Sequence, residues 1–410
     1  MGISNQTRNA IVIGGSISGL FAALLLRRHG WRVDVYERTP GELAGRGAGI
    51  VAQPELREAL AAAEIGDVGD VGVRVETRLL LDASGAIVMR HPCPQIVTSW
   101  EHMHRLLRAR LPDAHYHAGA ELTHLDMQGG ATRAHFADGR TAEADLVIGA
   151  DGIRSTVRRQ LFPEARPEYA GYVAWRSLVD ERAFPATLHA QIFWHMAFGL
   201  PAGEQFIGYP VTGEGDDMTP GTLRYNIVWY RPADEATELK RLLTDDSGRV
   251  HTQSIPPPLV RAEVRAEMRE AAARLLAPQF RAAVALSPQP FLQPIYDLDS
   301  QRLAQGPVAI IGDAAFVARP HLAAGVIKAA EDVLSIVAAL VTEPDVPAAL
   351  RRYETERRPV GHRIVARARE MGANYRPAAS SDTVARLSGA DTGYARRVLE
   401  DTALTGFLYK

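Results

Sequence analysis

The residues nearest the N-terminus that could do chemistry form a short run of small side chains. The run is Gly14-Gly15-Ser16-Ile17-Ser18-Gly19. It follows an apolar stretch, and Glu37 stands at the end of the next strand-like stretch. Small residues at this spacing allow a tight turn and a closely packed helix. The N–H groups that begin the helix attract a pyrophosphate, and the later acid accepts hydrogen bonds from a ribose. The spacing predicts a dinucleotide site that includes Glu37 and Arg38, but it does not separate NAD from FAD.

The elements around this run fit that prediction. Residues 9–13 are predicted to form a buried strand, 18–29 a helix and 32–36 a second strand. Gly30 is expected to end the helix, because glycine readily adopts the left-handed conformation that follows many helices. The three elements make a βαβ unit.

A second stretch places an acid and a glycine between a predicted strand and a predicted helix. Residues 145–161 read DLVIGADGIRSTVRRQL, and the turn carries Asp151 and Gly152. The apolar run before the turn is typical of a buried strand. The strand–turn–helix order therefore repeats that of the first motif.

A third stretch late in the chain has the same order. Residues 308–333 read VAIIGDAAFVARPHLAAGVIKAAEDV, and a buried strand is predicted over 307–311. Gly312 and Asp313 form the turn, and a helix is expected to begin near Gly325. Taken alone, Asp313 can either bind a ligand hydroxyl or cap its own turn.

The composition limits the classes of function. The chain has 410 residues, which predicts two domains or one large elaborated domain. Its net charge of -2 argues against a general nucleic-acid binder. The single cysteine, Cys93, can form neither an internal disulfide nor a cysteine zinc site, which fits a reducing cytoplasm. No run approaches ~18 apolar residues, so no transmembrane helix is expected, and no metal-spaced cluster is found.

The middle of the chain has a different pattern. From about 171 to 231, strand-like segments alternate with turn residues, which predicts an antiparallel sheet. A strand over QIFWHMAF would place Phe193 and His195 on one face. Helices are predicted over 101–111, 261–276 and 345–373. The last helix is expected to break or kink near Pro359.

The three motifs, in this order and spacing, resemble those of the class A flavoprotein aromatic hydroxylases, the para-hydroxybenzoate hydroxylase type. The resemblance covers about residues 8–370, and the stretches GYVAWRSLVDE and YETERRP add to it. It implies an α/β fold with a Rossmann-type FAD-binding domain, an inserted antiparallel β-sheet domain for the substrate, and C-terminal helices. The implied FAD-binding domain is discontinuous, with residues 1–80, 98–170 and 295–375. The substrate domain would comprise 81–97 and 171–294, followed by a tail, 376–410, that is predicted to be helical.

The resemblance also assigns residues to the cofactor. The ADP part of FAD would be held by Gly14, Ser16, Ile17, Ser18, Gly19, Glu37 and Arg38. The second motif, Asp151 and Gly152, would support the FAD site and the reaction with NAD(P)H, and Gly312 and Asp313 would bind the ribityl and pyrophosphate part. Arg46 and Gly49, in GRGAGI, resemble a segment at the flavin edge. Ala324 and Gly325 begin a helix whose N-terminal amides would stabilise the negative charge of reduced flavin.

Several positions depart from the common family pattern. Phe316 replaces a histidine, Ala323-Ala324-Gly325 replaces Gly-Gln-Gly, and Ile327 replaces an asparagine. Trp100 occupies the place of a family arginine. The sequence GDAAFVARPHLAAGVIKA is similar to the variant in the subgroup that hydroxylates 2,6-dihydroxypyridine, which predicts membership of that subgroup.

The resemblance implies a reaction in which NAD(P)H reduces FAD and O2 then forms a C4a-hydroperoxide that hydroxylates a small hydroxylated aromatic or heteroaromatic ring. His321 and Pro320 are predicted to be catalytic, since an unperturbed histidine suits proton handling and a fixed carbonyl can face a substrate hydroxyl. His195, Tyr209 and Asn226 are the predicted substrate-binding residues, although core packing explains each of them equally well.

Other functions stay open. The same scaffold could modify or detoxify a larger natural product, which the modest insert disfavours. It could be a flavin oxidase or dehydrogenase that does not hydroxylate, or a flavin-bound sensor or binding protein without turnover. A plain NAD dehydrogenase is disfavoured, because it has no use for the Gly-Asp turn. The expected partners are a small aromatic substrate and a second copy of the chain in a homodimer, without nucleic acid or membrane.

Overall fold

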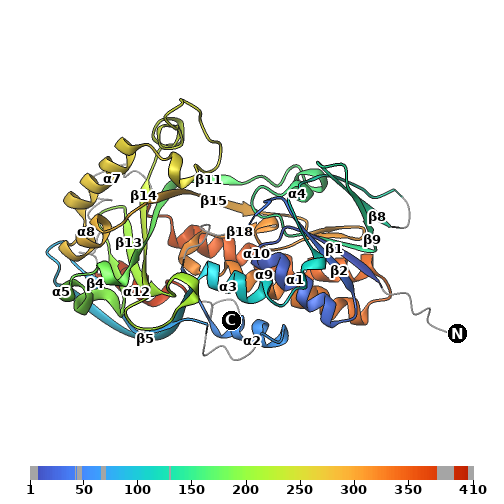
Figure 1. The fold of residues 1–410 in the computed structure, drawn as a ribbon, viewed down its shortest axis with the longest axis horizontal. Coiled ribbons are helices and arrows are strands. Elements are labelled where there is room, and N and C mark those ends of the chain that lie inside the picture. The colour runs from blue at the N-terminus through green and yellow to red at the C-terminus, as the bar shows by residue number, and fades with distance from the viewer. Residues whose placement is uncertain are drawn as a thin grey trace.

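The computed structural model describes residues 8–41, 43, 49–65, 71–128, 131–375 and 392–404. Within these residues the strands form sheets of six, nine and three strands. Figure 1 shows the nine-stranded sheet on the left and the six-stranded sheet on the right, with the helices α9 (Gly325–Thr342) and α10 (Val346–Met371) near the middle. The predicted α/β fold, a Rossmann-type part combined with a β-rich part and C-terminal helices, is confirmed.

The six-stranded sheet brings the three motifs together. Its strands in spatial order are β16 (Ala304–Gln305), β17 (Val308–Ile310), β10 (Leu146–Gly149), β1 (Asn9–Ile13), β2 (Arg32–Glu37) and β6 (Tyr116–Ala118). β1 pairs in parallel with β2 and β10, and β10 pairs in parallel with β17. Parallel neighbours end at one edge of a sheet, which is where open α/β sheets bind ligands. The turns after β1, β10 and β17, which are the three motifs, therefore lie side by side.

The first βαβ unit follows the sequence prediction closely. α1 (Ile17–Arg28) connects β1 to β2, and its apolar side chains Leu20, Phe21 and Leu25 are buried. Gly30 has φ +83°, and its N–H donates to the Arg27 carbonyl at 3.0 Å. The glycine thus ends the helix in the left-handed conformation that its lack of a side chain permits.

The nine-stranded sheet is mainly antiparallel. Its strands in spatial order are β18 (Phe316–Val317), β15 (Phe291–Asp299), β11 (Glu168–Asp180), β14 (Arg224–Pro232), β13 (Gln205–Val211), β12 (Met196–Gly199), β4 (Val73–Leu81), β5 (Ile87–Ser99) and β3 (Gly49–Val51). Only β12 and β4 pair in parallel. β18 belongs to the third motif, so this motif connects the two large sheets. The predicted domain boundaries stay a prediction.

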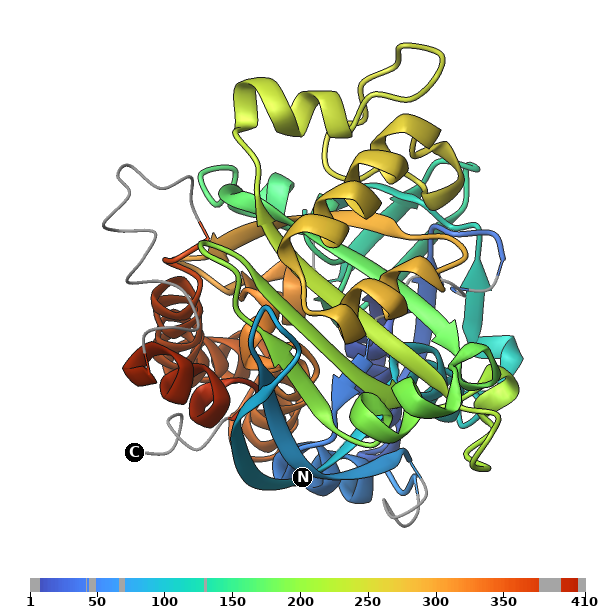
Figure 2. The ribbon, with the colours of Figure 1, turned by 90° about the vertical axis from the view of Figure 1, so that its left-hand side faces the viewer.

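Two helices cover one face of the nine-stranded sheet. α7 (Ala262–Leu275) and α8 (Pro278–Ala285) lie in front of its strands in Figure 2. Phe280 of α8 stacks on Phe206 of β13, with 4.3 Å between the ring centroids. Side chains alternate along a strand, so the neighbouring Ile207 and the next odd-numbered residue, Tyr209, face the other side of the sheet. That other face is directed toward the third motif.

The remaining elements are smaller. They are α2 (Pro54–Ala62), α3 (Trp100–Arg108), β7 (Leu122–Asp126), β8 (Thr132–Phe136), β9 (Thr141–Ala144), α4 (Thr156–Leu161), α5 (Ala186–Leu188), α6 (Lys240–Leu242) and short 3-10 or π turns. None of the helices among the described residues combines the length and the apolar character needed to cross a bilayer.

Two predicted elements differ from the structure. The strand expected over QIFWHMAF is wrong in its first half, because residues His189–Phe193 form a π-helical turn and β12 begins only at Met196. The predicted shared face of Phe193 and His195 is therefore also wrong. Phe193 instead packs into an aromatic cluster with Phe184. The helix α10 runs through Pro359 without a break, since buried residues on both sides of the proline hold it against the sheet.

The C-terminal helix α12 (Thr392–Asp401) belongs to the core of the nine-stranded sheet. It packs against β4, and its side chains Tyr394, Val398 and Leu399 are buried. The guanidinium of Arg78 on β4 is fully buried and donates to the Leu399 carbonyl at 2.5 Å and to Gln95 Oε1 at 2.7 Å. A buried charge of this kind is stable only with such partners, so Arg78 fixes α12 to the sheet.

Replacing Arg78 with glutamine should loosen α12. Loss of a charge-assisted hydrogen bond corresponds to roughly a tenfold to hundredfold change in a local opening equilibrium. Hydrogen–deuterium exchange of residues 392–403 should accelerate by about that factor, with β1 and β10 unchanged. Arg74→Gln is the matched control, because Arg74 lies on the same strand and is exposed. Unchanged protection of α12 in Arg78→Gln would contradict this role.

Candidate active site

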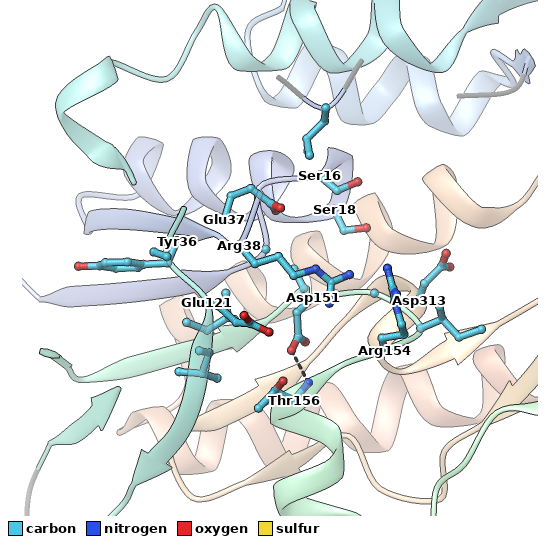
Figure 3. Close-up of a pocket in the computed structure, with 18 of the residues that line it drawn as sticks. Ser16, Ser18, Tyr36, Glu37, Arg38, Glu121, Asp151, Arg154, Thr156 and Asp313 are labelled. Atoms are coloured by element: carbon cyan, nitrogen blue, oxygen red, sulfur yellow. Dashed lines mark hydrogen bonds between the residues drawn. The ribbon is translucent and has the colours of Figure 1, made fainter. Parts of the chain in front are cut away.

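The three motif turns enclose a cavity of about 350 Å³ (Figure 3). Its lining includes Gly14, Ser16, Ser18, Glu37, Arg38, Trp100, Asp151, Gly152, Arg154 and Asp313. Figure 3 labels the side chains of Ser16, Ser18, Glu37, Arg38, Asp151, Arg154 and Asp313, which lie at or just after the ends of β1, β2, β10 and β17, whereas Trp100 begins α3. The structure therefore brings together most of the residues that the sequence assigned to a dinucleotide. Ile17 and Gly19 lie in α1 directly behind the cavity wall.

Glycine is required at two positions of the first motif by close backbone contacts. Gly14 has φ +107°, and a Cβ there would lie 2.4 Å from the Ala150 carbonyl oxygen of the second motif. A Cβ on Gly19 would lie 1.9 Å from the Gly14 carbonyl oxygen. Any side chain at either position would push α1 away from the sheet edge. The glycines thus set the distance between the cavity and the start of α1.

Glu37 is buried beside the first motif. Its carboxylate accepts hydrogen bonds from the Gly15 N–H at 2.8 Å and from the Thr39 N–H at 2.9 Å. These bonds hold the side chain at the cavity wall. Carboxylate oxygens can accept more than one hydrogen bond each, so Glu37 still has capacity for a ligand hydroxyl.

Asp151 carries a buried acceptor without a partner. Its Oδ2 accepts from the Thr156 N–H at 2.6 Å, as Figure 3 shows, while its Oδ1 has no hydrogen-bond partner within the described residues. Burial of the carboxyl raises its pKa. The hydrogen bonds that it accepts act in the opposite direction, but burial has the larger effect. A buried unsatisfied acceptor costs free energy, so this oxygen marks a place for a ligand donor or a bound water.

Arg158 connects the second and third motifs. It is buried and donates to the Ala314 carbonyl at 2.9 Å and to the Ile153 carbonyl at 2.5 Å. Burial lowers its pKa to about 10, so it stays charged at neutral pH. Fixed contacts from one cation to both turns hold the two motifs in register.

A second cavity, of about 270 Å³, continues from the first. Asp313 and Ile153 line both cavities. The carboxylate of Asp313 is 56% exposed and lies 3.7 Å from the ammonium of Lys328, a buried residue of α9. Burial lowers the pKa of Lys328, and the nearby Asp313 opposes that effect. Asp313 is thus an accessible acceptor at the junction, held by a cation underneath.

The second cavity lies between the nine-stranded sheet and the third motif. The third motif contributes Pro320, His321, Ala324 and Gly325. The helix α9 begins at Gly325, so its free N–H groups are at this wall, as the sequence predicted. Gly49 lines the opposite side, and Gly312 packs against Ser18 of α1, where a Cβ would lie 2.5 Å from the hydroxyl oxygen. Arg46 lies outside the described residues.

His321 is buried at the back of the second cavity, with 2% exposure. Its Nε2 lies 2.7 Å from the Tyr172 hydroxyl, and its Nδ1 has no partner among the described residues. Burial, with Arg319 and Arg176 nearby, lowers its pKa to about 3, so the ring is neutral. Burial raises the pKa of Tyr172 well above 10, which keeps it a phenol. We infer that the phenol donates to Nε2, which leaves the imidazole proton on Nδ1.

The three predicted substrate-binding residues have different positions. Tyr209 is buried and lines the second cavity, and burial raises its pKa to about 12. Asn226 is buried just behind the lining, where its Oδ1 accepts from the Gly49 N–H at 3.4 Å. His195 is half-buried and does not line this cavity, because the π-helical turn before it changes its direction.

Sequence reasoning missed several residues that line the second cavity. They are Arg176, Met196, Ile207, Val228, Tyr230, Thr402 and Ala403. The chain segment after α12 closes this side, because the Ala403 N–H donates to the His321 carbonyl at 2.8 Å. Arg176 could have been found from the sequence, since a charged residue in the middle of the apolar stretch YVAWRSLV is unusual in a buried strand.

Comparisons with known proteins define the family. A model described as FAD binding domain-like matches residues 169–297, and one described as an NAD(P)-binding Rossmann-like domain matches residues 12–63. The chain is 33% identical to 2,6-dihydroxypyridine 3-monooxygenase of Paenarthrobacter nicotinovorans, over 90% of this chain and 92% of that protein. It is 30% identical to 3-amino-4-hydroxybenzoate 2-monooxygenase of Streptomyces cremeus, over 89% of this chain and 86% of that protein.

A solved structure agrees with these relatives. The structure of 2,6-dihydroxypyridine-3-hydroxylase from Arthrobacter nicotinovorans matches with a TM-score of 0.85 and 31% identity, over 93% of this chain and 97% of that one. The chain therefore belongs to the class A FAD-dependent aromatic hydroxylases, and it is an oxidoreductase that uses FAD, NAD(P)H and O2. The predicted similarity to the 2,6-dihydroxypyridine hydroxylase subgroup is confirmed.

The two joined cavities fit FAD, which is a long ligand with a polar and an aromatic end. The unpartnered Oδ1 of Asp151 and the glycine-lined turn at Gly14 suit the ADP part in the first cavity. Asp313 at the junction suits the ribityl chain, and the second cavity, whose sheet wall combines the apolar Met196, Ile207 and Val228 with polar side chains, suits the flavin ring and a substrate. Among the described residues no group of His, Cys, Asp and Glu side chains is placed to hold a metal.

Replacing Asp313 with asparagine should weaken FAD binding without unfolding the chain. The carboxylate is exposed, so its removal leaves the core intact, but a charge-assisted hydrogen bond to a ribityl hydroxyl becomes a neutral one. We expect the Kd for FAD to rise by about tenfold, the effect of roughly 1.4 kcal/mol. Titration of apoprotein followed by flavin fluorescence measures it. Asp246→Asn, in an exposed turn of another region, should leave the Kd unchanged.

His321 should make stability depend on pH in the acid range. Its pKa is about 3 when folded and about 6.5 when unfolded, so between these values only the unfolded chain takes up the proton. The free energy of unfolding should therefore fall as pH is lowered from 6 to 4, by up to about 1.4 kcal/mol per pH unit from this residue. Urea unfolding of His321→Asn should show a shallower slope, and His124→Asn, at an exposed site, the wild-type slope.

Proposed function

We propose that this chain hydroxylates a small hydroxylated heteroaromatic ring, with 2,6-dihydroxypyridine as the first candidate. The observation that carries the proposal is the second cavity of about 270 Å³, which brings His321, Pro320 and the start of α9 to one small space that joins the first cavity at Asp313. The relative at 33% identity is named for that substrate, and it spans nearly the whole chain. NAD(P)H would supply the electrons, and either NADH or NADPH is compatible with the proposal.

FAD, when bound, carries the electrons to O2 and supplies the oxygen-transfer chemistry. The chain has to bind the ring, orient it and exclude water. Ile207, Val228 and Met196 form an apolar wall on which a ring can lie flat. The segment Thr402–Ala403 closes the side of the cavity, which supports the exclusion of water.

His321 would act as a neutral donor in this proposal. Its pKa of about 3 makes it a poor base at neutral pH, and no described residue accepts a hydrogen bond from its Nδ1–H. It would therefore hold a proton toward a ring oxygen rather than remove one. Pro320, which precedes it, fixes the turn and lines the same cavity.

The alternatives have less support. A larger natural product is disfavoured by the modest length of the insert over residues 171–294. A flavin-bound sensor without turnover was suggested only by departures in the third motif. One of these departures has a structural role, since Phe316 packs edge-on against His362 at 5.6 Å between the ring centroids. We infer a cytoplasmic enzyme from the single cysteine and a homodimer from the family resemblance, and light scattering of the FAD-loaded chain tests the dimer.

The test is oxidation of NADH and NADPH by the FAD-loaded protein, with and without 2,6-dihydroxypyridine. The ligand should stimulate oxidation, and mass spectrometry should find a product with one added oxygen atom. Stimulation that yields hydrogen peroxide without product would mean that the class is right and the ring is wrong. No stimulation by this ring or by other small hydroxypyridines and phenols would contradict the proposed function.

A further inference from the structure

Tyr172 lies on β11, behind the wall of the second cavity. Its side chain is fully buried and is not part of the cavity lining. Its hydroxyl oxygen lies 2.7 Å from Nε2 of His321, which does line the cavity. Tyr172 therefore reaches a ligand in the cavity only through His321.

Arg319 restricts the direction in which the Tyr172 hydroxyl can donate. The Cζ atom of Arg319 lies 5.5 Å from the centroid of the Tyr172 ring. A Cβ on Gly372, which ends α10, would lie 2.6 Å from the Tyr172 hydroxyl oxygen and 2.7 Å from Nη1 of Arg319. The two groups thus meet in a space that only glycine leaves open. A guanidinium has donors and no acceptor, so the phenol proton cannot go to Arg319.

A buried ion pair keeps Arg319 in this place. Its guanidinium donates to both carboxylate oxygens of Asp297, at 2.9 Å and 2.8 Å, and both residues are buried. Nε of Arg369 donates to the same carboxylate at 3.2 Å. A buried pair with two parallel hydrogen bonds has a fixed geometry. The cation beside Tyr172 is therefore a fixed part of the fold.

These contacts leave one direction for the hydrogen bond between Tyr172 and His321. If Nε2–H of His321 donated to the phenol oxygen, the buried phenol proton would have no acceptor among the described residues. A buried donor without an acceptor costs free energy. With the phenol as donor, Nε2 is the acceptor. The neutral imidazole then carries its proton on Nδ1, which no described residue contacts by a hydrogen bond.

We propose that Tyr172 is a positioning residue that sets the tautomer of His321, so that the ring in the second cavity meets an Nδ1–H donor. The inference rests on the proposed function and adds to it a rule of substrate selection. A fixed N–H donor favours rings that present an oxygen acceptor at that position. It disfavours rings of the same shape that present an amino group, because two donors would then face each other.

The first measurement determines the tautomer of His321 directly. The FAD-loaded protein is labelled with 15N at histidine Nδ1 only and studied by solid-state NMR at pH 8, where a protonated and a bare ring nitrogen have well-separated shifts. The chain has 13 histidines, so the signal of His321 is identified as the one that His321→Asn removes. We expect a protonated Nδ1 in the wild type. A bare Nδ1 would overturn the proposal without any variant of Tyr172.

Tyr172→Phe keeps the ring and removes only the hydroxyl. Without its donor, Nε2 can carry the proton, so the Nδ1 signal should move to the bare position or divide between the two positions. The matched control is Tyr375→Phe. Tyr375 is buried 5.0 Å from the His321 ring between centroids, but its hydroxyl donates to Gln205. The control should keep the wild-type signal. An unchanged signal in Tyr172→Phe, or an equal change in Tyr375→Phe, contradicts the role of Tyr172.

The second measurement connects the tautomer to the ligand. Binding of 2,6-dihydroxypyridine and of 2,6-diaminopyridine to the oxidised FAD-loaded protein is followed by flavin absorbance at pH 8. The wild type should prefer the ring with oxygens. In Tyr172→Phe the Kd for the dihydroxypyridine should rise by about three- to tenfold, the effect of one neutral hydrogen bond. The Kd for the diaminopyridine should stay the same or fall, because a bare Nδ1 can accept from an amino group.

The outcomes separate this proposal from the proposed function. A tautomer change without a change in the preference between the two rings means that Nδ1 does not face the ligand, and the proposal fails. A wild type that binds and hydroxylates a ring but has a bare Nδ1 overturns only the role of Tyr172. A wild type with a protonated Nδ1 that neither binds nor hydroxylates any small hydroxylated ring contradicts the proposed function, and the proposed selection rule fails with it.

Discussion

The contact between the Gly14 turn and the Ala150 carbonyl determines how the rest of the site is built. It forces the first two motifs to meet without a side chain between them, at the edge where β1 and β10 end. The same parallel sheet brings β17 to that edge, so the third motif meets the other two. A cavity that suits a dinucleotide forms there, because the glycine-lined turn brings the N–H groups that begin α1 to the same edge as Glu37 and Asp151.

Buried cations hold these turns in place and do so in different ways. Arg158 donates to carbonyls of the second and third motifs and so joins two segments that are distant in sequence. Lys328 lies beneath Asp313, the acceptor at the junction of the two cavities. Arg78 anchors α12, whose following residues close the second cavity. Each of these charges has partners inside the protein, whereas no described residue forms a hydrogen bond or ion pair with the buried guanidinium of Arg176.

The second cavity is a product of two sheets rather than of one motif. Its sheet wall comes from alternate residues of β11 to β14, and its opposite wall from the loop and helix that follow β17. The face of the sheet that does not line the cavity is covered by α7 and α8, which leaves a single face for a substrate. The proposed reaction site therefore lies where the cofactor turn of one sheet meets the open face of another.

The sequence by itself determined the βαβ unit, the three motifs and the cofactor class. These depend on local rules, since glycine spacing, apolar periodicity and a strand-ending acid act within about 25 residues of one another. It failed at His189–Phe193, where packing of Phe193 against Phe184 overrides the alternating pattern of a strand. The break predicted near Pro359 is also wrong, because α10 continues through the proline, while the predicted kink there stays a prediction.

Only the tertiary structure decided which side chains face the substrate. Arg176 and Thr402 are more than 200 residues apart and have no motif of their own, yet they line one cavity. His321 was chosen from the sequence for proton handling at an unperturbed pKa, but its surroundings lower that pKa and hold the ring neutral, because burial acts on a group through everything packed around it. Local spacing predicts where a backbone turns, whereas charge state and cavity shape depend on residues that only the folded chain brings together.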